Sequence, residues 1–225
     1  MDTLIDIPKS VRHPARYTEV LLPVFVEMLR GSRRVVDPFG GTGRIFRLNQ
    51  WLPELEIQAV ELEPEWAALN PRTTLGNALA LPWSAGYFDA VCTSPAYGNR
   101  MADKILIDGY QRNTYANDLG RALHPDNGAG MQWGEAYRSF HVGVWREAVR
   151  VLQPGGRLVL NIKDHIRDGE RQLVTDWHIA ALVDLGFKVE AHRKIETPGN
   201  GFGAWRDYRI PYESVILFRL EQEEL

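Results

Sequence analysis

Short apolar segments typical of β-strands alternate with amphipathic segments typical of helices along most of this chain. A first helix is expected over residues 18–30. The strand-like segments that follow are RRVVDPF, IQAVEL, TTLGNAL, YFDAVCTS and RLVLNIK. Helix-like segments lie near residues 44–52, 64–70, 134–152 and 171–185. Because such alternation requires parallel strands joined by crossover helices, we expect a doubly wound, Rossmann-like α/β sheet.

The last two strand-like segments, FKVEAHRKI and ESVILFRLE, follow one another without a helix between them. They are therefore expected to pair antiparallel, which gives a mostly parallel seven-stranded sheet with an antiparallel last strand. The chain has 225 residues, of which 44% are hydrophobic, and this is enough for one good core. No repeat or linker interrupts the sequence, so we expect a single domain over residues 1–225.

The composition narrows the classes of protein to which the chain could belong. The only cysteine is Cys92, which excludes an internal disulfide framework and a clustered zinc site, so no metal is implied. The sequence shows neither a signal peptide nor an apolar run long enough to cross a membrane, and we expect a cytoplasmic protein without membrane association. A formal net charge of -3 argues against a general polyanion binder but leaves room for a basic face.

Two connections are longer than a compact sheet needs. Residues 99–133 separate a strand from its crossover helix, and residues 197–212 join the last two strands. Both follow the carboxyl ends of strands, where open α/β sheets bind ligands. We expect the first to be a substrate-side insertion and the second a substrate-side loop.

The segment DPFGGTG, residues 37–43, ends the first strand and leads into a helix. Its glycines allow a ligand to approach the backbone closely beside a helix N-terminus. No Gly-Lys-Ser/Thr follows, and the spacing is not G-x-G-x-x-G, so the segment matches neither a phosphate-binding loop nor the dinucleotide fingerprint. The carboxylate of Asp37 would repel a pyrophosphate and favours a sulfonium or amino group.

The next two strands end in residues that suit an adenosine. Glu61 closes IQAVEL and could accept hydrogen bonds from both hydroxyls of a ribose. Asn77 and Ala78 follow the third strand, where the Asn77 amide could read an adenine edge. Taken singly, Glu61 also suits a solvated surface and Asn77 a turn. Together with Asp37 they predict a site for an adenosine that carries a positive group.

The segment TSPAYGNR follows the fourth strand, and with it the sequence resembles the class I S-adenosylmethionine-dependent methyltransferases. It resembles more closely the amino-group DNA methyltransferases that act on cytosine N4 or adenine N6. DPFGGTG is similar to their first motif, HPARY (residues 13–17) to a motif that precedes it, and SPAY (residues 94–97) to their catalytic tetrapeptide. The resemblance implies S-adenosylmethionine as cofactor and the following cofactor-binding residues: His13, Pro14, Asp37, Phe39, Gly40, Gly41, Gly43, Glu61, Asn77 and Ala78.

The chemistry of amino methylation explains the tetrapeptide. An exocyclic amine is a poor nucleophile, because its lone pair is delocalised into the base. The Ser94 hydroxyl and the Pro95 carbonyl would hold its hydrogens and turn the lone pair toward the methyl group, while Tyr97 stacks on the extruded base. Serine at the first position favours cytosine N4. Ala96 departs from the family pattern, which has a second proline there.

The resemblance also implies a nucleic-acid partner, with DNA as the first candidate. Residues with suitable cationic or aromatic side chains lie in the two long connections: Arg100, Tyr115, Arg121, Trp205, Arg206 and Arg209. Three alternatives stay open for the target: adenine N6, an exocyclic amine of RNA, and a protein amide or small amine, although the last leaves the two long connections harder to explain. An inactive module that only binds cofactor or nucleic acid also stays open, as does a homodimer. Cys92 lies within a strand, so core packing is favoured over a role as nucleophile in carbon-5 methylation.

Overall fold

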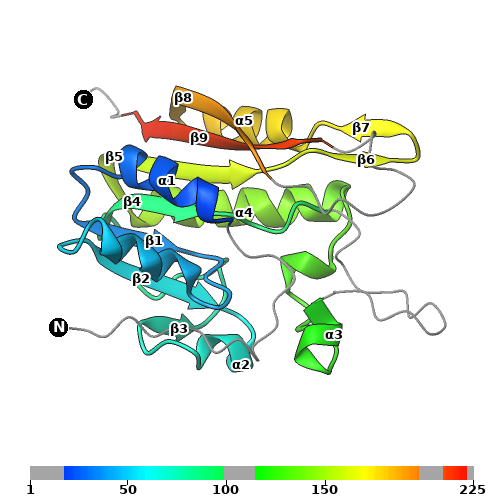
Figure 1. Ribbon diagram of the computed structural model, residues 1–225, viewed down its shortest axis with the longest axis horizontal. Coiled ribbons are helices and arrows are strands. Elements are labelled where there is room, and N and C mark those ends of the chain that lie inside the picture. The colour runs from blue at the N-terminus through cyan, green and yellow to red at the C-terminus, as the bar shows by residue number, and fades with distance from the viewer. Residues whose placement is uncertain (1–17, 99–114, 198–209, 222–225) are drawn as a thin grey trace.

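A single seven-stranded sheet organises the part of the chain that the computed structural model describes, residues 18–98, 115–197 and 210–221 (Figure 1). The strands are β1 (Arg34–Asp37), β2 (Glu56–Glu61), β3 (Thr73–Leu75), β4 (Phe88–Thr93), β5 (Leu152–Ile162), β8 (Phe187–Glu196) and β9 (Tyr212–Leu220). Their order is β3-β2-β1-β4-β5-β9-β8. Strands β1 to β5 are parallel, and β9 is antiparallel to both β5 and β8. The expected fold class is confirmed.

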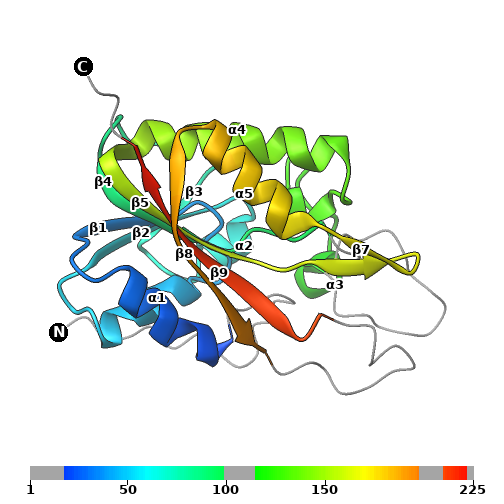
Figure 2. The same ribbon diagram turned by 90° about the horizontal axis from the view of Figure 1, so that it is seen from above.

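Helices cover both faces of the sheet. Helix α1 (Leu22–Met28), preceded by the 3-10 turn η1 (Glu19–Leu21), lies on one face, and α4 (Glu135–Val151) and α5 (Val174–Asp184) lie on the other (Figure 2). The segment η2 (Arg44–Gln50) is a 3-10 helix that packs with α1. The other helical elements of the described residues are short: α2 (Pro64–Ala67), α3 (Tyr115–Leu119) and η3 (Gly128–Gly130).

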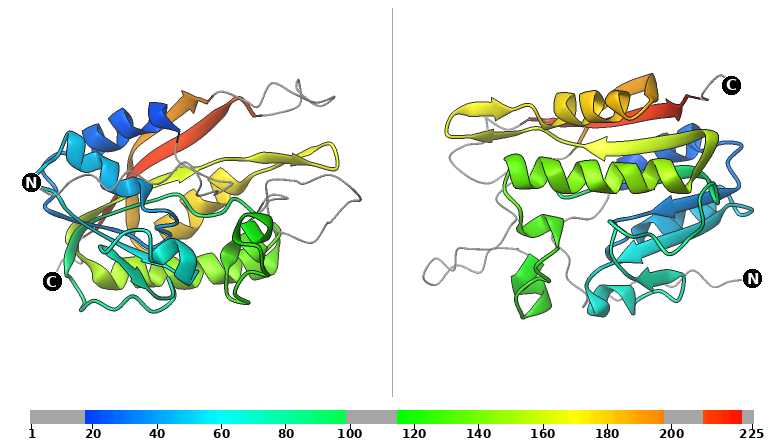
Figure 3. Two further views of the ribbon diagram at one scale, coloured as in Figure 1. Left: turned by 60° about the horizontal axis from the view of Figure 1, so that its bottom comes forward. Right: turned by 180° about the vertical axis from the view of Figure 1, so that it is seen from behind.

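The sequence did not predict the hairpin formed by β6 (His165–Arg167) and β7 (Glu170–Gln172). It extends beyond the end of α4 (Figure 3), and α5 therefore begins at Val174, later than expected. The third strand also stops earlier than expected, at Leu75. It ends there because the Asn77 side chain accepts a hydrogen bond from the backbone of Leu79 at 2.9 Å and forms a turn.

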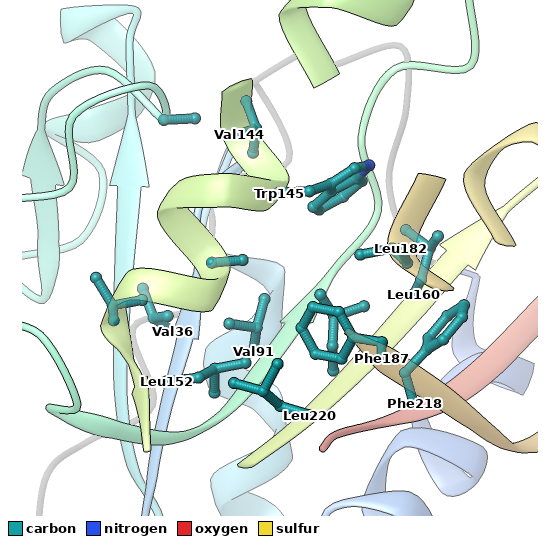
Figure 4. Packing of buried hydrophobic residues seen from close by; sticks show 14 of the residues in the cluster. Val36, Val91, Val144, Trp145, Leu152, Leu160, Leu182, Phe187, Phe218 and Leu220 are labelled. Atoms are coloured by element: carbon teal, nitrogen blue, oxygen red, sulfur yellow. The ribbon is translucent and has the colours of Figure 1, made fainter. Parts of the chain in front are cut away.

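Two hydrophobic clusters lie on opposite sides of the sheet. In the larger one, Val144 and Trp145 of α4 and Leu182 of α5 pack near strand residues such as Val91 and Leu160 (Figure 4). Cys92 belongs to the other cluster and is fully buried. Burial raises the pKa of the Cys92 thiol well above its ordinary value, and the nearby Asp37 adds to this. The structure thus agrees with core packing and not with a nucleophilic cysteine.

Candidate functional site

The carboxyl ends of β1 and β4 are joined by a hydrogen bond between side chains. Because the two strands are neighbours, Asp37 at the end of β1 lies beside Thr93 at the end of β4. Thr93 Oγ1 donates to Asp37 Oδ1 at 2.6 Å, and the backbone N–H of Phe39 donates to the same oxygen at 3.0 Å. Both Asp37 and Thr93 are buried. The DPFGGTG and SPAY segments therefore lie side by side.

The glycines of DPFGGTG satisfy two separate steric requirements. Gly40 lies so close to β2 that a Cβ atom there would come within 2.8 Å of Ala59 Cβ. Gly41 and Gly43 have φ angles of 52° and 78°, in the left-handed region that favours glycine. Phe39 packs against the rings of α4, with 6.2 Å between its ring centroid and that of Phe140.

Glu61 lies at the end of β2 and faces the glycine loop. Each of its carboxylate oxygens accepts one backbone hydrogen bond, from Gly41 N and from Glu63 N, both at 2.8 Å. Only 7% of the residue is exposed, and this burial raises the pKa of Glu61 to about 7 although the backbone hydrogen bonds oppose the shift. A carboxylate oxygen has room for more than one hydrogen bond, so Glu61 could still accept two hydroxyl groups.

Asn77 and Ala78 follow β3 at the same edge. The Asn77 amide donates to Asp126 Oδ2 at 3.4 Å, in addition to its turn contact with Leu79. Ala78 is buried in the larger hydrophobic cluster. The roles of Asn77 and Ala78 in holding an adenine stay predictions.

The SPAY segment forms a polar cluster with two residues that the sequence did not indicate. Ser94 Oγ lies 2.9 Å from Tyr97 Oη. The amide Nδ2 of Asn161, at the end of β5, lies 3.1 Å from Ser94 Oγ and 2.9 Å from Tyr97 Oη. Glu213 Oε2 accepts from Tyr97 at 3.1 Å and from Asn161 at 2.7 Å. Burial, followed by the charge of Glu213, raises the pKa of Tyr97 well above its ordinary value. Pro95, which follows Ser94 in the sequence, is buried.

A buried chain of hydrogen bonds supports the SPAY segment from α4 and α5. Trp145 Nε1 donates to His178 Nδ1 at 3.1 Å, so the neutral imidazole carries its hydrogen on Nε2. That nitrogen lies 3.0 Å from Tyr137 Oη, and the Tyr137 hydroxyl donates to the carbonyl of Ala96 at 2.8 Å. Burial lowers the pKa of His178 well below its ordinary value. The Ala96 carbonyl is thus held by a rigid, neutral network.

In the described part of the long insertion, residues 115–129 pack beside the ends of β2 and β3, whereas the backbone N–H of Trp133 donates to the carbonyl of Gly98 at 2.9 Å. The fully buried Glu63 accepts hydrogen bonds from His124 N at 2.9 Å and Asn127 Nδ2 at 2.7 Å. Arg121, which the sequence offered for phosphates, forms ion pairs with Glu63 and Glu65 at 2.7 and 2.5 Å. The two carboxylates balance its charge in this structure, and the phosphate role predicted for Arg121 stays a prediction.

Tyr115 was predicted to stack on the substrate, and the structure places its ring against Trp66 of α2. Only 7% of the residue is exposed, and its ring meets Trp66 edge-on with 5.8 Å between the centroids. Six other predicted site residues lie outside the described residues: His13, Pro14, Arg100, Trp205, Arg206 and Arg209. Their roles stay predictions, as does the extent of the domain.

Among the residues that the structure describes, no group of three or more His, Cys, Asp or Glu side chains could hold a metal ion. None of the helices in the described part of the chain is both long and apolar enough to span a bilayer.

The comparisons with known proteins concern the fold. The sequence matches no protein-family model and no curated protein. The PH0226 protein from Pyrococcus horikoshii OT3 superimposes with a TM-score of 0.58 at 15% identity, over 96% of this chain and 97% of that one. An S-adenosylmethionine-dependent methyltransferase from Methanosarcina mazei superimposes with a TM-score of 0.57 at 15% identity, over 89% and 98%. This is the class I methyltransferase fold.

A third structure with the class I methyltransferase fold is a putative sarcosine dimethylglycine methyltransferase from Galdieria sulphuraria. It is 12% identical, with a TM-score of 0.55 over 95% of this chain and 93% of that one. In the class I methyltransferase fold of this chain, the DPFGGTG and SPAY segments occupy the ends of the neighbouring strands β1 and β4.

Proposed function

We propose that the protein transfers a methyl group from S-adenosylmethionine to an exocyclic amino group of a nucleic-acid base, with cytosine N4 in DNA as the first candidate. The observation that carries the proposal is the 2.6 Å hydrogen bond from Thr93 to Asp37. It fixes the segment that would hold the amine next to the segment that would hold the methyl donor. Transfer between two bound groups depends above all on such positioning.

The residues at the ends of β1 and β2 fit the cofactor. Asp37 places a buried carboxylate where a cationic group would be stabilised, and the glycine loop lets a ligand approach the backbone. Glu61 keeps lone pairs for two ribose hydroxyls after accepting hydrogen bonds from Gly41 and Glu63. When bound, S-adenosylmethionine would supply a methyl group on a cationic sulfur.

The SPAY segment supplies the groups for the amine. The Ser94 hydroxyl and the Pro95 carbonyl would accept hydrogen bonds from the amino group and orient its lone pair. Tyr97 would stack its ring on the base while its hydroxyl stays in the polar cluster with Ser94. The Ala96 carbonyl has a different partner, because it accepts a hydrogen bond from the Tyr137 hydroxyl.

The choice of base rests on the resemblance of SPAY to the cytosine-N4 enzymes. Adenine N6 of DNA and an exocyclic amine of RNA would use the same residues in the same roles. A module that binds the cofactor without turnover is the alternative of another class. That the partner is DNA and that the protein forms a homodimer are likewise proposals.

The test is methyl transfer from isotopically labelled S-adenosylmethionine to duplex DNA, single-stranded DNA and total RNA, followed by nucleoside digestion and mass spectrometry. We expect labelled N4-methylcytosine in DNA from the wild-type protein and none from Ser94→Ala. Ser84→Ala is the matched control, because Ser84 is exposed in the connection that precedes β4. Labelled N6-methyladenine or a methylated ribonucleoside would change the target and keep the chemistry. Cofactor binding without transfer to any of them would contradict the proposal.

A further inference from the structure

A carboxylate that the sequence did not indicate lies next to Ser94. Glu213 is the second residue of β9, and because β9 runs antiparallel to β5, its first residues reach the edge where β4 and β5 end. Glu213 Oε2 lies 3.1 Å from Tyr97 Oη, which in turn lies 2.9 Å from Ser94 Oγ. Asn161 Nδ2 contacts all three side chains. Ser94 is thus linked to Glu213 by a continuous chain of hydrogen bonds through Tyr97.

The direction of these hydrogen bonds follows from their donors and acceptors. A carboxylate only accepts, so the Tyr97 hydroxyl donates to Glu213. Tyr97 Oη then has a lone pair with which to accept the hydroxyl hydrogen of Ser94. Asn161 directs a hydrogen to Glu213 at 2.7 Å, and the opposite amide orientation would place its oxygen against the carboxylate. Ser94 Oγ is left with lone-pair capacity to accept a hydrogen from an amine.

We propose that Ser94, Tyr97 and Glu213 form a proton relay that removes the proton released by the substrate amine, with Glu213 as the final acceptor. The inference rests on the proposed function, in which an amino group receives the methyl group. Ser94 would touch the amine itself. Tyr97, through its hydroxyl, and Glu213 act through Ser94, and Asn161 fixes the orientation of the carboxylate.

The relay balances the reaction. The nitrogen forms its new bond to the methyl carbon as the carbon–sulfur bond of the donor breaks, and the electron pair of that bond stays on sulfur as a neutral thioether. The methylated nitrogen is then cationic and loses one proton to Ser94 Oγ. The Ser94 hydroxyl proton passes to Tyr97 Oη, and the Tyr97 proton passes to Glu213, which becomes a carboxylic acid. Glu213 is partly exposed and can return the proton to water.

Ser94 alone is too weak a base to remove the proton from the amine. A serine hydroxyl is a weak base, whereas a carboxylate two hydrogen bonds away is a competent acceptor. Burial and the neighbouring charge keep the pKa of Tyr97 high, so Tyr97 passes a proton on and does not hold a negative charge. A purely structural role, in which the same contacts only tie β9 to the SPAY segment, predicts a loss of stability without a specific loss of rate.

The first test measures single-turnover methyl transfer to the nucleic acid that the wild-type protein methylates. Tyr97→Phe keeps the ring and removes the hydroxyl, and Glu213→Gln keeps the shape and removes the proton acceptor. We expect each to lower the rate about a hundredfold with unchanged Kd for S-adenosylmethionine and nucleic acid. The double variant should be no slower than the slower single variant, because both changes interrupt one path. Glu213→Asp should recover part of the rate.

A second tyrosine–glutamate pair provides matched controls. Tyr87 Oη donates to Glu56 Oε1 at 3.4 Å, and the two residues lie where β4 and β2 begin, at the opposite edge of the sheet. Tyr87→Phe and Glu56→Gln should leave the rate unchanged. The relay would be overturned by wild-type rates in Tyr97→Phe or Glu213→Gln, or by a double variant whose loss is the product of the two single losses.

A second readout needs no turnover. In protein carrying ¹³C-labelled tyrosine and no cofactor, the Tyr97 hydroxyl proton is identified by NMR through its loss in Tyr97→Phe. We expect it downfield, as for a proton donated to a carboxylate, and we expect it to move upfield in Glu213→Gln. An unchanged resonance would overturn the relay whatever the substrate. The protein could show the expected upfield shift in Glu213→Gln and still methylate no nucleic acid. That result would overturn the proposed function and retain the relay for another amine.

Discussion

Thr93 donates a 2.6 Å hydrogen bond to Asp37, from the end of one central strand to the end of its neighbour. Both side chains are buried, and water cannot replace the threonine hydroxyl without rearrangement. Thr93→Val keeps the shape of the side chain and removes the donor. We expect the free energy of unfolding to fall by about 1–3 kcal/mol, measured by urea denaturation, and the affinity for S-adenosylmethionine to fall, measured by calorimetry.

Thr73→Val is the control for this change. The Thr73 hydroxyl oxygen is buried and has no hydrogen-bond partner among the described residues. Its replacement by valine should therefore leave stability unchanged or raise it. An equal loss in both variants would show that the Thr93–Asp37 contact has no special role.

Glu61 should make cofactor binding depend on pH. Its pKa of about 7 lies above the ordinary value because of burial, so the residue gains negative charge only as the pH rises through 7. A carboxylate accepts hydroxyl hydrogen bonds better than the neutral acid does. We expect the Kd for S-adenosylmethionine to decrease as the pH rises from 6 to 8, which is about one unit on either side of that pKa. Glu61→Gln should bind more weakly and with a flat profile, and a wild-type slope in this variant would contradict the assignment.

The buried imidazoles of His141 and His178 should destabilise the protein in acid. Burial lowers the pKa of His141 to about 4 and that of His178 well below its ordinary value. The unfolded chain thus binds more protons, and the free energy of unfolding is fully maintained above pH 6.5 and falls as the pH drops toward 4. The loss from His141 alone would be about 3 kcal/mol. His178→Gln should reduce the slope between pH 6.5 and 4 in urea denaturation, and an unaltered slope would exclude this histidine.

Glu63 should hold residues 115–133 against the sheet. Glu63 is fully buried, accepts hydrogen bonds from His124 and Asn127, and pairs with the partly exposed Arg121. Glu63→Ala should make the peptide bond after Arg121 more susceptible to trypsin, because local unfolding exposes it. Glu65→Ala, which removes only the exposed partner of Arg121, is the control. Equal cleavage rates in the two variants would count against Glu63 as the anchor.

Much of the fold could be predicted because local patterns and topology agree. Apolar runs such as RLVLNIK were sufficient to predict the sheet. The absence of a helix between the last two strands was sufficient to predict its antiparallel end. The β6–β7 hairpin was missed, since KDHIRDGERQ lacks the apolar alternation of a buried strand. The segment after Gly43 has an apolar spacing that suits either helix type, and it formed a 3-10 helix.

The sequence could predict that certain side chains would gather at one edge, where each lies beside the end of its own strand. Asp37, Glu61 and Ser94 lie at the ends of parallel strands, which share one edge of the sheet. Asn161 and Glu213 were missed because their proximity depends on pairing between β5 and β9, whose residues are distant in sequence. The insertion was assigned to the substrate side, and this stays a prediction: its described part contacts Glu63, which follows β2, and also Gly98, which follows the SPAY segment.

The position of β9 between β5 and β8 has a consequence for how the protein assembles. β8 pairs only with β9 among the described strands, so residues 187–196 have no place in the sheet until residues 212–220 have inserted. The contacts Thr93–Asp37 and Asn161–Glu213 join residues 56 and 52 positions apart, so both depend on long-range strand pairing, which is slow to form. The pairing of β1 with β4 does not involve β9, so the Asp37–Thr93 contact and the polar cluster at Ser94 are completed by separate pairing events during refolding.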